Sequence, residues 1–159
     1  MKIHFKKANI DDCEKIHQMQ ILGFKALLDK YQDYETSPGA ETFERVKERF
    51  NYSQVDQYFI ALQDEKIGYI RITRLSEDTC RLSQMFILPN YQGHGYAQQA
   101  INQVELLYPQ AEHWGLDTIK QELKLCHLYE KMGYKQTGVQ RNIKDGMDIV
   151  VYAKSSNKR

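Results

Sequence analysis

The spacing of hydrophobic residues divides the chain into segments of helical and of strand character. Helical segments carry apolar residues every three or four positions, whereas strand segments carry them at every second position or in short unbroken runs. On this basis the sequence predicts helices at about 12–24, after 41, at 97–108 and at 122–132. It predicts strands at 3–8, 58–62, 67–74, 79–88, 112–119, 134–143 and 147–153.

Turn residues punctuate these segments. Ser37-Pro38-Gly39 interrupts a polar and charged stretch between residues 25 and 50. Gly133 is placed to end the last helix in the left-handed conformation, and Asp145-Gly146 is a strong signal for a hairpin turn. The predicted order is an α/β mixture with a central meander, which differs from the strict alternation of a doubly wound sheet.

Length and charge narrow the class of protein. The chain has 159 residues, which predicts a single domain over 1–159. Twenty-two Lys and Arg balance 21 Asp and Glu, so no basic field favours nucleic acid or an anionic membrane. No apolar run approaches the roughly 20 residues of a membrane helix. The first residues lack the apolar stretch of a secretory signal, so we expect a cytoplasmic protein.

The cysteines do not form a recognisable pattern. Cys13, Cys80 and Cys126 are odd in number and widely separated. They offer neither a disulfide framework nor the paired spacing of a metal site. We therefore expect reduced thiols and no metal.

The segment with the clearest chemistry is Gln92-Gly93-His94-Gly95-Tyr96-Ala97, between a predicted strand and a predicted helix. Two glycines let the backbone approach a ligand closely, and the free N–H groups of the following helix favour an anion such as a pyrophosphate. A glycine-rich tight turn without a ligand is the alternative. A dinucleotide fingerprint fits poorly because residue 98 is glutamine, and no Gly-Lys-Ser/Thr marks a P-loop.

Two motifs together resemble a known family. Residues 92–97 resemble the Q/R-x-x-G-x-G/A signature of the GNAT (Gcn5-related N-acetyltransferase) superfamily. Residues 85–91, MFILPNY, are similar to the fourth strand of that family, and residues 128–134, LYEKMGY, to its LYEKxGF segment. The motifs occur in the family's order, with one predicted strand between them. The resemblance extends over residues 3–154, although its amino-terminal half depends on element order alone.

The resemblance implies a fold and a donor. The fold is a mixed, mostly antiparallel central sheet flanked by helices, in which a splayed pair of parallel strands forms a cleft for acetyl-CoA. By position, the backbone of Met85, Phe86 and Ile87 would bind the pantetheine arm. The pyrophosphate would be held by the amides of Gln92, Gly93, His94, Gly95, Tyr96 and Ala97. Met85–Ile87 are also compatible with a plain core strand, and His94 with a solvated loop residue.

Tyr129 is the catalytic residue that the resemblance implies. A phenol with a pKa of about 10 can donate a hydrogen bond or proton to the departing CoA sulfur. The alternative is a core tyrosine on a helix face shared with Leu125 and Met132. Cys126, three residues earlier, is a core residue or the nucleophile of an acetyl-cysteine route. Direct transfer in a ternary complex is the mechanism that we favour.

The chain departs from the family at two places. Seven residues before Tyr129, many members have an asparagine that contacts the cofactor, but this chain has Glu122. A carboxylate cannot donate as an amide does, which puts that contact in doubt. On the fourth strand, where some members have a glutamate base, this chain has Ser83 and Gln84. A base then acts through water or lies elsewhere.

The resemblance also implies an amine acceptor, whose pocket members of the family usually build from the segment after the first strand. That segment carries tyrosines and acids that are either a pocket for a cationic amine or a solvated helix face: Tyr31, Asp33, Tyr34, Glu35, Glu41, Glu44 and Glu48. Trp114, Tyr134 and the final hairpin either line the other side of the pocket or contact a second copy in a homodimer.

Three hypotheses follow. The first is an N-acetyltransferase that acts on a small-molecule or peptide amine. The second is a non-catalytic acyl-CoA-binding protein of the same fold, which the missing glutamate and Glu122 favour slightly. The third is a nucleotide-binding module of another fold, which Gln98 disfavours.

Overall fold

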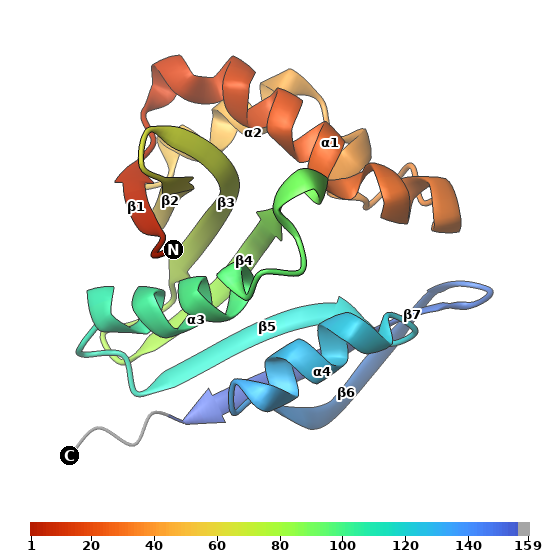
Figure 1. Ribbon diagram of the computed structural model, residues 1–159. Helices are drawn as coiled ribbons and strands as arrows, with labels where there is room; N and C mark the ends of the chain where they lie inside the picture. The colour runs from red at the N-terminus through yellow and green to blue at the C-terminus, as the bar shows by residue number, and fades with distance from the viewer. Residues whose placement is uncertain (156–159) are drawn as a thin grey trace.

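A mixed β-sheet runs through the centre of the computed structural model, which describes residues 1–155 (Figure 1). Within that range the sheet has seven strands in the spatial order β1-β2-β3-β4-β5-β7-β6. The strands are β1 (His4–Lys7), β2 (Val55–Leu62), β3 (Glu65–Arg74), β4 (Thr79–Ile87), β5 (His113–Ile119), β6 (Lys135–Lys144) and β7 (Met147–Ser155). The helices are α1 (Cys13–Tyr31), α2 (Phe43–Glu48), α3 (Tyr96–Leu107) and α4 (Leu123–Lys131). Single 3₁₀ turns are η1 (Ile10–Asp12), η2 (Pro38–Ala40), η3 (Arg49–Asn51) and η4 (Pro89–Tyr91).

Helices cover both faces of the sheet because the side chains of each strand alternate between two cores. Ile60 on β2 points into the core beneath α3 and α4, whereas its neighbour Phe59 points into the core beneath α1 and α2. The first core also holds Trp114 and Tyr152, and the second holds Ile16 of α1. This two-sided burial explains the nearly continuous hydrophobic runs of the central strands.

The pair β4 and β5 is the only parallel pair in the described sheet, and it is short. Its register ends after Arg81 opposite Gly115, although β4 continues to Ile87 and β5 to Ile119. A bulge leaves Ser83 of β4 without a partner on β3 and bends the strand at this point. Beyond it the two strands diverge, as Figure 1 shows. The expected mostly antiparallel sheet with a splayed parallel pair is thus confirmed.

Most of the predicted elements are confirmed, including the hairpin at Asp145-Gly146, where Gly146 has a φ of +79°. The first helix was predicted to end near residue 24, which is wrong, because α1 continues to Tyr31. Its last turns include the exposed residues Lys25 and Asp29, which form an ion pair one turn apart. None of the helices within residues 1–155 is long and apolar enough to cross a membrane.

Gly68 of β3 provides a test of how closely β3 and β4 are packed. A Cβ atom at this position would lie far inside contact distance of the Phe86 carbonyl oxygen, which is backbone and cannot rotate away. We expect Gly68→Ala to destabilise the protein by about 1–3 kcal/mol, measured by urea unfolding. Gly115→Ala in β5 is the matched control, because its Cβ would meet nothing closer than the Tyr152 oxygen at 3.8 Å. Equal stabilities of the two variants would contradict the packing described.

Candidate functional site

The loop between β4 and α3 is shaped by two glycines in the left-handed region. Gly93 has a φ of +83° and Gly95 a φ of +79°, a conformation that side chains with a Cβ rarely adopt. Gly95 is also the residue from which α3 begins. The Gln92 side chain braces the loop, because its Nε2 donates to the carbonyl oxygen of Ile87 at 2.9 Å. The loop is thereby tied to the end of β4.

The backbone of this loop presents hydrogen-bond donors to the outside. The N–H groups of Gly93, His94 and Gly95 have no acceptor among residues 1–155. The first N–H groups of α3, which follow at once, have none within the helix either. A Cβ built at Gly93 or Gly95 would meet nothing within 4 Å, so the space in front of the loop is open. Converging N–H groups at a helix N-terminus, with open space before them, suit a phosphate or pyrophosphate.

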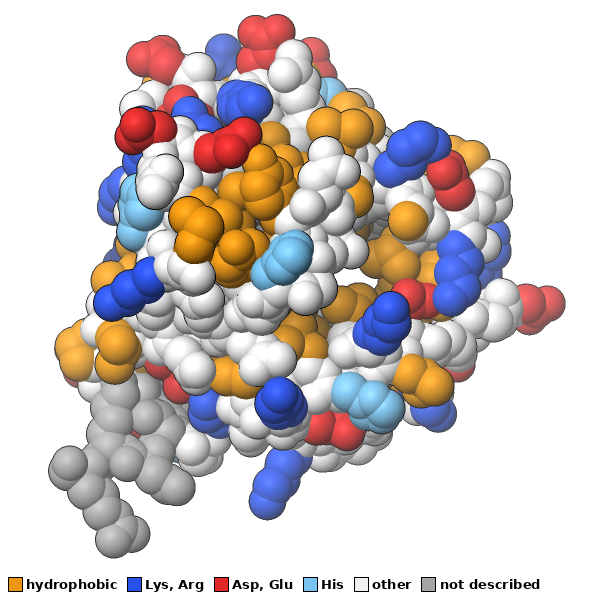
Figure 2. All heavy atoms as spheres, in the orientation of Figure 1, with side chains coloured by type: hydrophobic (Ala, Val, Ile, Leu, Met, Phe, Trp, Pro, Cys, Tyr) orange, Lys and Arg blue, Asp and Glu red, His pale blue; other side chains and the backbone are white. Residues whose placement is uncertain are grey.

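A cavity of about 840 Å³ begins at this loop and follows the opening between β4 and β5. Leu116–Ile119 of β5 form one wall, and residues 82–87 of β4 form the other. The edge of β4 that faces β5 has no ladder partner beyond Arg81, so its backbone groups face the cavity. Figure 2 shows the hollow between the two halves of the molecule, with hydrophobic side chains at its walls.

The structure brings nearly all the predicted site residues to this cavity. Those that line it are Met85, Phe86, Ile87, Gln92, Gly93, Gly95, Tyr96, Ala97 and Tyr129. His94 does not line it; its exposed ring lies beside that of Tyr96, with ring centroids 5.6 Å apart. The placement of His94 agrees with a solvated loop residue.

Tyr129 lies on α4 in the cavity wall, and its ring is 8% exposed. The ring packs edge-on against Tyr134 at 6.1 Å between centroids. Its hydroxyl has no hydrogen-bond partner among residues 1–155. Burial raises the pKa of Tyr129 to about 12, with a smaller contribution from the electrostatic interaction with Cys126. The phenol is therefore protonated at neutral pH, and its hydroxyl is available as a hydrogen-bond donor.

Cys126 belongs to the core rather than to the cavity. Its side chain is buried, and it does not line the cavity. The thiol is directed toward the carbonyl oxygens of Ile119 and Lys120, at 3.7 and 3.6 Å. This geometry gives no support to a route through an acetyl-cysteine.

Glu122 joins the two sides of the cavity. Its Oε2 accepts hydrogen bonds from Lys30 Nζ at 2.7 Å and from Tyr31 Oη at 2.5 Å, both at the end of α1. Burial works to raise the pKa of Glu122, but these two hydrogen bonds outweigh it and hold the pKa below its usual value. Glu122 is thus an anion engaged with α1, in a position where many family members have a cofactor-binding asparagine.

The cavity extends beyond the loop to a second wall built by α1 and η2. Gly23, Phe24 and Leu27 of α1 contribute to this wall, and Pro38 of η2 continues it. Ser83 and Gln84 of β4 line the cavity as well. The hydroxyl of Ser83 is 2.7 Å from that of Thr73. No carboxylate occupies the β4 positions that sequence reasoning examined for a base.

Few of the tyrosines and acids in the predicted acceptor segment can contact a ligand in the cavity. Of its tyrosines and acids, only Tyr31 and Asp33 line the cavity. Glu41 instead pairs with Arg49, and Glu48 is exposed and pairs with Arg45. The solvated-face interpretation therefore holds for most of the segment.

Of the two interpretations of Trp114 and Tyr134, a place on the opposite side of the pocket is not supported. Both are core residues, 1% and 2% exposed, that do not line the cavity. The final hairpin does line it, through Arg141, Ile143, Met147 and Ile149.

Sequence reasoning missed one group that spans the cavity. Asp117 of β5 is paired with Arg81 of β4 at 2.9 Å and with Arg141 of β6 at 3.3 Å. Arg81 and Asp117 lie on different strands, close to where the two strands part. Only the pairing of β4 with β5, which no local signal in the sequence reports, brings these residues together.

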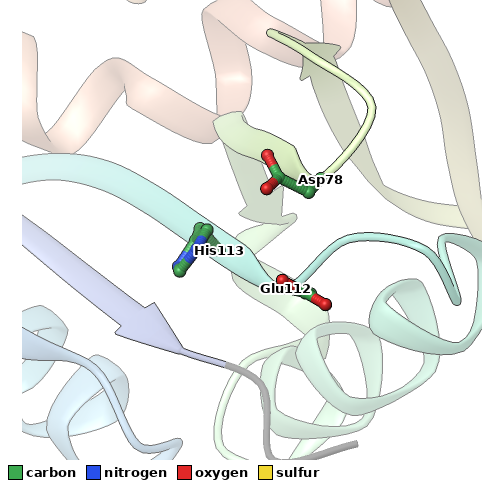
Figure 3. Close-up of side chains that lie close together, drawn as sticks. All are labelled: Asp78, Glu112 and His113. Atoms are coloured by element: carbon green, nitrogen blue, oxygen red, sulfur yellow. The ribbon is translucent and has the colours of Figure 1, made fainter.

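A separate group of potential metal ligands lies outside the cavity. Asp78 at the start of β4 and Glu112 and His113 at the start of β5 present ligand atoms within 4.8 Å of one another (Figure 3). All three are exposed, and none lines the cavity. The Asp78 carboxylate already accepts hydrogen bonds from Ser76 and Thr79. We assign this group no part in the site.

Comparison with solved structures finds the same fold in known acetyltransferases. An acetyltransferase from Thermus thermophilus matches with a TM-score of 0.75 at 14% identity, covering 98% of both chains. Spermidine N-acetyltransferase from Vibrio cholerae, in complex with CoA and spermine, matches with a TM-score of 0.77 at 19% identity, covering 97% of this chain and 95% of that one. The PaiA N-acetyltransferase from Thermoplasma acidophilum, in complex with coenzyme A, matches with a TM-score of 0.70 at 15% identity, covering 98% and 100%.

Comparison with curated proteins finds no match. The family model for the acetyltransferase (GNAT) family matches residues 24–134, which is more than half of the chain. That match includes the glycine loop, both diverging strands and Tyr129. The chain therefore belongs to the acetyltransferase (GNAT) family.

Proposed function

We propose that the protein is an N-acetyltransferase that moves an acetyl group from acetyl-CoA to a primary amine by direct attack in a ternary complex. The observation that carries this proposal is the continuity of the cavity. One space of about 840 Å³ connects the glycine loop, the Tyr129 wall and the wall of α1 and η2. A donor at the loop and an acceptor at the α1 wall would meet in it without a covalent enzyme intermediate, and holding both is itself a large part of catalysis.

The residues present fit acetyl-CoA. The unpartnered N–H groups of Gly93, His94 and Gly95 would bind the pyrophosphate, together with the first turn of α3. The free edge of β4 at Met85–Ile87 would hold the pantetheine arm through backbone groups. Acetyl-CoA would supply the acetyl group as an activated thioester. Crystal structures of two similar proteins contain CoA, which supports this assignment.

Tyr129 would donate a hydrogen bond or proton to the sulfur that leaves. Its hydroxyl is uncommitted and lies in the cavity wall, and its pKa of about 12 keeps it protonated throughout the neutral range. No side chain of the described β4 segment offers a carboxylate base, because Ser83 and Gln84 occupy the relevant wall. The amine proton would therefore pass to water in the cavity, and catalysis would depend mainly on positioning and on Tyr129.

An amine acceptor is supported by the walls of the cavity and by the comparison. The described lining includes three carboxylates, Asp33, Asp117 and Glu122. Two of the similar structures are N-acetyltransferases by their descriptions, and one of these contains spermine. The lack of a carboxylate at Ser83 and Gln84 is compatible with a non-catalytic acyl-CoA-binding protein, but the uncommitted hydroxyl of Tyr129 in the cavity wall supports an enzyme.

Gly95→Trp tests the donor site. An indole here would fill the open space in front of the loop, so we expect the Kd for acetyl-CoA to rise at least about tenfold, or about 1.4 kcal/mol, by isothermal titration calorimetry. Gly138→Trp in β6 is the matched control, because Gly138 also has a positive φ, +94°, and open space around its Cβ, but does not line the cavity. An unchanged Kd for acetyl-CoA in Gly95→Trp would contradict the assignment of this loop as the pyrophosphate site.

Tyr129→Phe tests the proposed acid. We expect kcat to fall about 100-fold or more, with the Kd for acetyl-CoA nearly unchanged, because only the proton donor is lost. The melting temperature should stay close to that of the wild type, because the hydroxyl has no hydrogen bond to lose. Since the Tyr129 pKa is about 12, wild-type kcat should not fall between pH 7 and pH 10. Steady-state release of free CoA measures kcat, titration calorimetry measures the Kd for acetyl-CoA, and thermal unfolding gives the melting temperature.

The control for this substitution is Tyr108→Phe, which removes a hydroxyl bonded to Asp56 outside the cavity. It should lower stability and leave kcat intact. An undiminished kcat in Tyr129→Phe would remove Tyr129 from the mechanism.

A further inference from the structure

Asp33 is a buried carboxylate in the wall of the cavity. It comes just after α1, whose capping residue Gln32 has a left-handed conformation with a φ of +55°. That residue ends the helix and turns the chain inward. Asp33 is consequently only 6% exposed, although it belongs to a connecting segment, and it lines the cavity beside Thr36 and Ser37.

No cation neutralises this carboxylate. Its oxygens accept hydrogen bonds from the N–H and the hydroxyl of Thr36, and from no other group in residues 1–155. No lysine, arginine or histidine of the same residues forms an ion pair with it. A buried charge without a counterion costs several kcal/mol, a cost that a cationic ligand would offset.

The other carboxylates of the cavity wall are different. Asp117 is held by two arginines, and Glu122 is held by Lys30 and Tyr31. Their negative charges are already compensated within the protein. Among the described residues that line the cavity, Asp33 is the one carboxylate with its charge available to a ligand.

Gln84 is a further polar residue of the cavity lining. Gln84 of β4 is 7% exposed and lines the cavity, and its Oε1 has no hydrogen-bond partner. Gln84 shares the face of β4 that carries Phe86, which packs against Phe24 of α1. The Oε1 atom itself is buried, and Arg71, the cross-strand neighbour of Gln84 on β3, also has an unpaired Nη1, so Gln84 is no evidence for a cationic ligand.

The turn at Asp33 does not require the charge. The contacts with Thr36 are those of a side-chain-closed turn, which an asparagine forms as readily as an aspartate. An uncharged side chain would therefore serve the backbone without the cost of burying an anion. The turn alone leaves the negative charge unexplained.

We infer that Asp33 binds a positively charged group of the acceptor, so that the substrate is a primary amine carrying a second ammonium group. This inference deepens the proposed function and rests on it. The charge bound at Asp33 belongs to the second amine, because the attacking nitrogen must lose its proton to react and a carboxylate favours the protonated form. A diamine or polyamine meets this requirement, whereas a monoamine with an apolar tail does not.

The test uses two acceptors that differ only in the second charge, 1,5-diaminopentane and n-pentylamine. For the wild-type protein we expect kcat/KM to be about 10- to 100-fold higher for the diamine, as a charge-assisted hydrogen bond provides. In Asp33→Asn we expect that preference to fall to less than about threefold, through loss of activity toward the diamine alone. The Kd for acetyl-CoA should be unchanged.

The matched control is Asp29→Asn, the same substitution on α1. Asp29 is exposed, pairs with Lys25 and does not line the cavity, so its loss should leave the preference for the diamine intact. A binding measurement separates recognition from turnover. Calorimetric titration of 1,5-diaminopentane into the protein saturated with CoA should show binding that Asp33→Asn weakens at least about tenfold.

The outcomes distinguish this inference from the function on which it rests. If the wild type acetylates both amines equally well, the inference about Asp33 is overturned. The assignment as an acetyltransferase is unaffected by this outcome. If Asp33→Asn reduces kcat/KM equally for both amines, Asp33 has a structural role only, which also overturns it. If acetyl-CoA does not bind and no amine is acetylated, the proposed function fails and this inference falls with it.

Discussion

The parting of β4 from β5 is the constraint on which the rest of the site depends. Backbone pairing holds the strands together only as far as Arg81 and Gly115, and the bulge at Ser83 then bends β4 away. The ion pair between Arg81 and Asp117 spans the two strands near the point of separation. Two consequences follow from this one departure from a regular sheet. A strand edge with free backbone groups is exposed inside the molecule, and a space opens that continues from the glycine loop to α1.

Charge is distributed unevenly around that space. Glu122 and Asp117 are engaged with cations of the protein, so they stabilise the arrangement of the walls rather than select a ligand. The pairing of Glu122 with Lys30 and Tyr31 also connects α4, which carries Tyr129, to the end of α1. Asp33, just beyond that end, keeps an uncompensated charge. In this account Asp117 and Glu122 have structural roles, whereas Asp33 recognises the ligand. Only the three-dimensional positions of these carboxylates distinguish the two roles.

The sequence predicts most of the fold and the donor side of the site, because those signals are local. Gly93 and Gly95 are needed for a backbone shape, and the LYEKMGY segment marks the helix of Tyr129. The end of α1 could not be predicted, since a glutamine rather than a glycine adopts the left-handed conformation there. Trp114 and Tyr134 look like pocket residues in a sequence but are core residues. The role of Asp33 depends on which neighbouring acids find a counterion, as Glu41 does with Arg49, and spacing along the chain does not report this.

Amide hydrogen exchange with and without acetyl-CoA tests the central claim most directly, because it examines the loop itself in the unmodified protein. The N–H groups of Gly93, His94 and Gly95 have no acceptor among residues 1–155 and should exchange rapidly in the free protein. If the loop binds the pyrophosphate, acetyl-CoA slows exchange at these three amides more than at the exposed β6–β7 turn around Gly146. Unchanged exchange at the loop under saturating acetyl-CoA, or protection confined to other parts of the chain, would contradict the account.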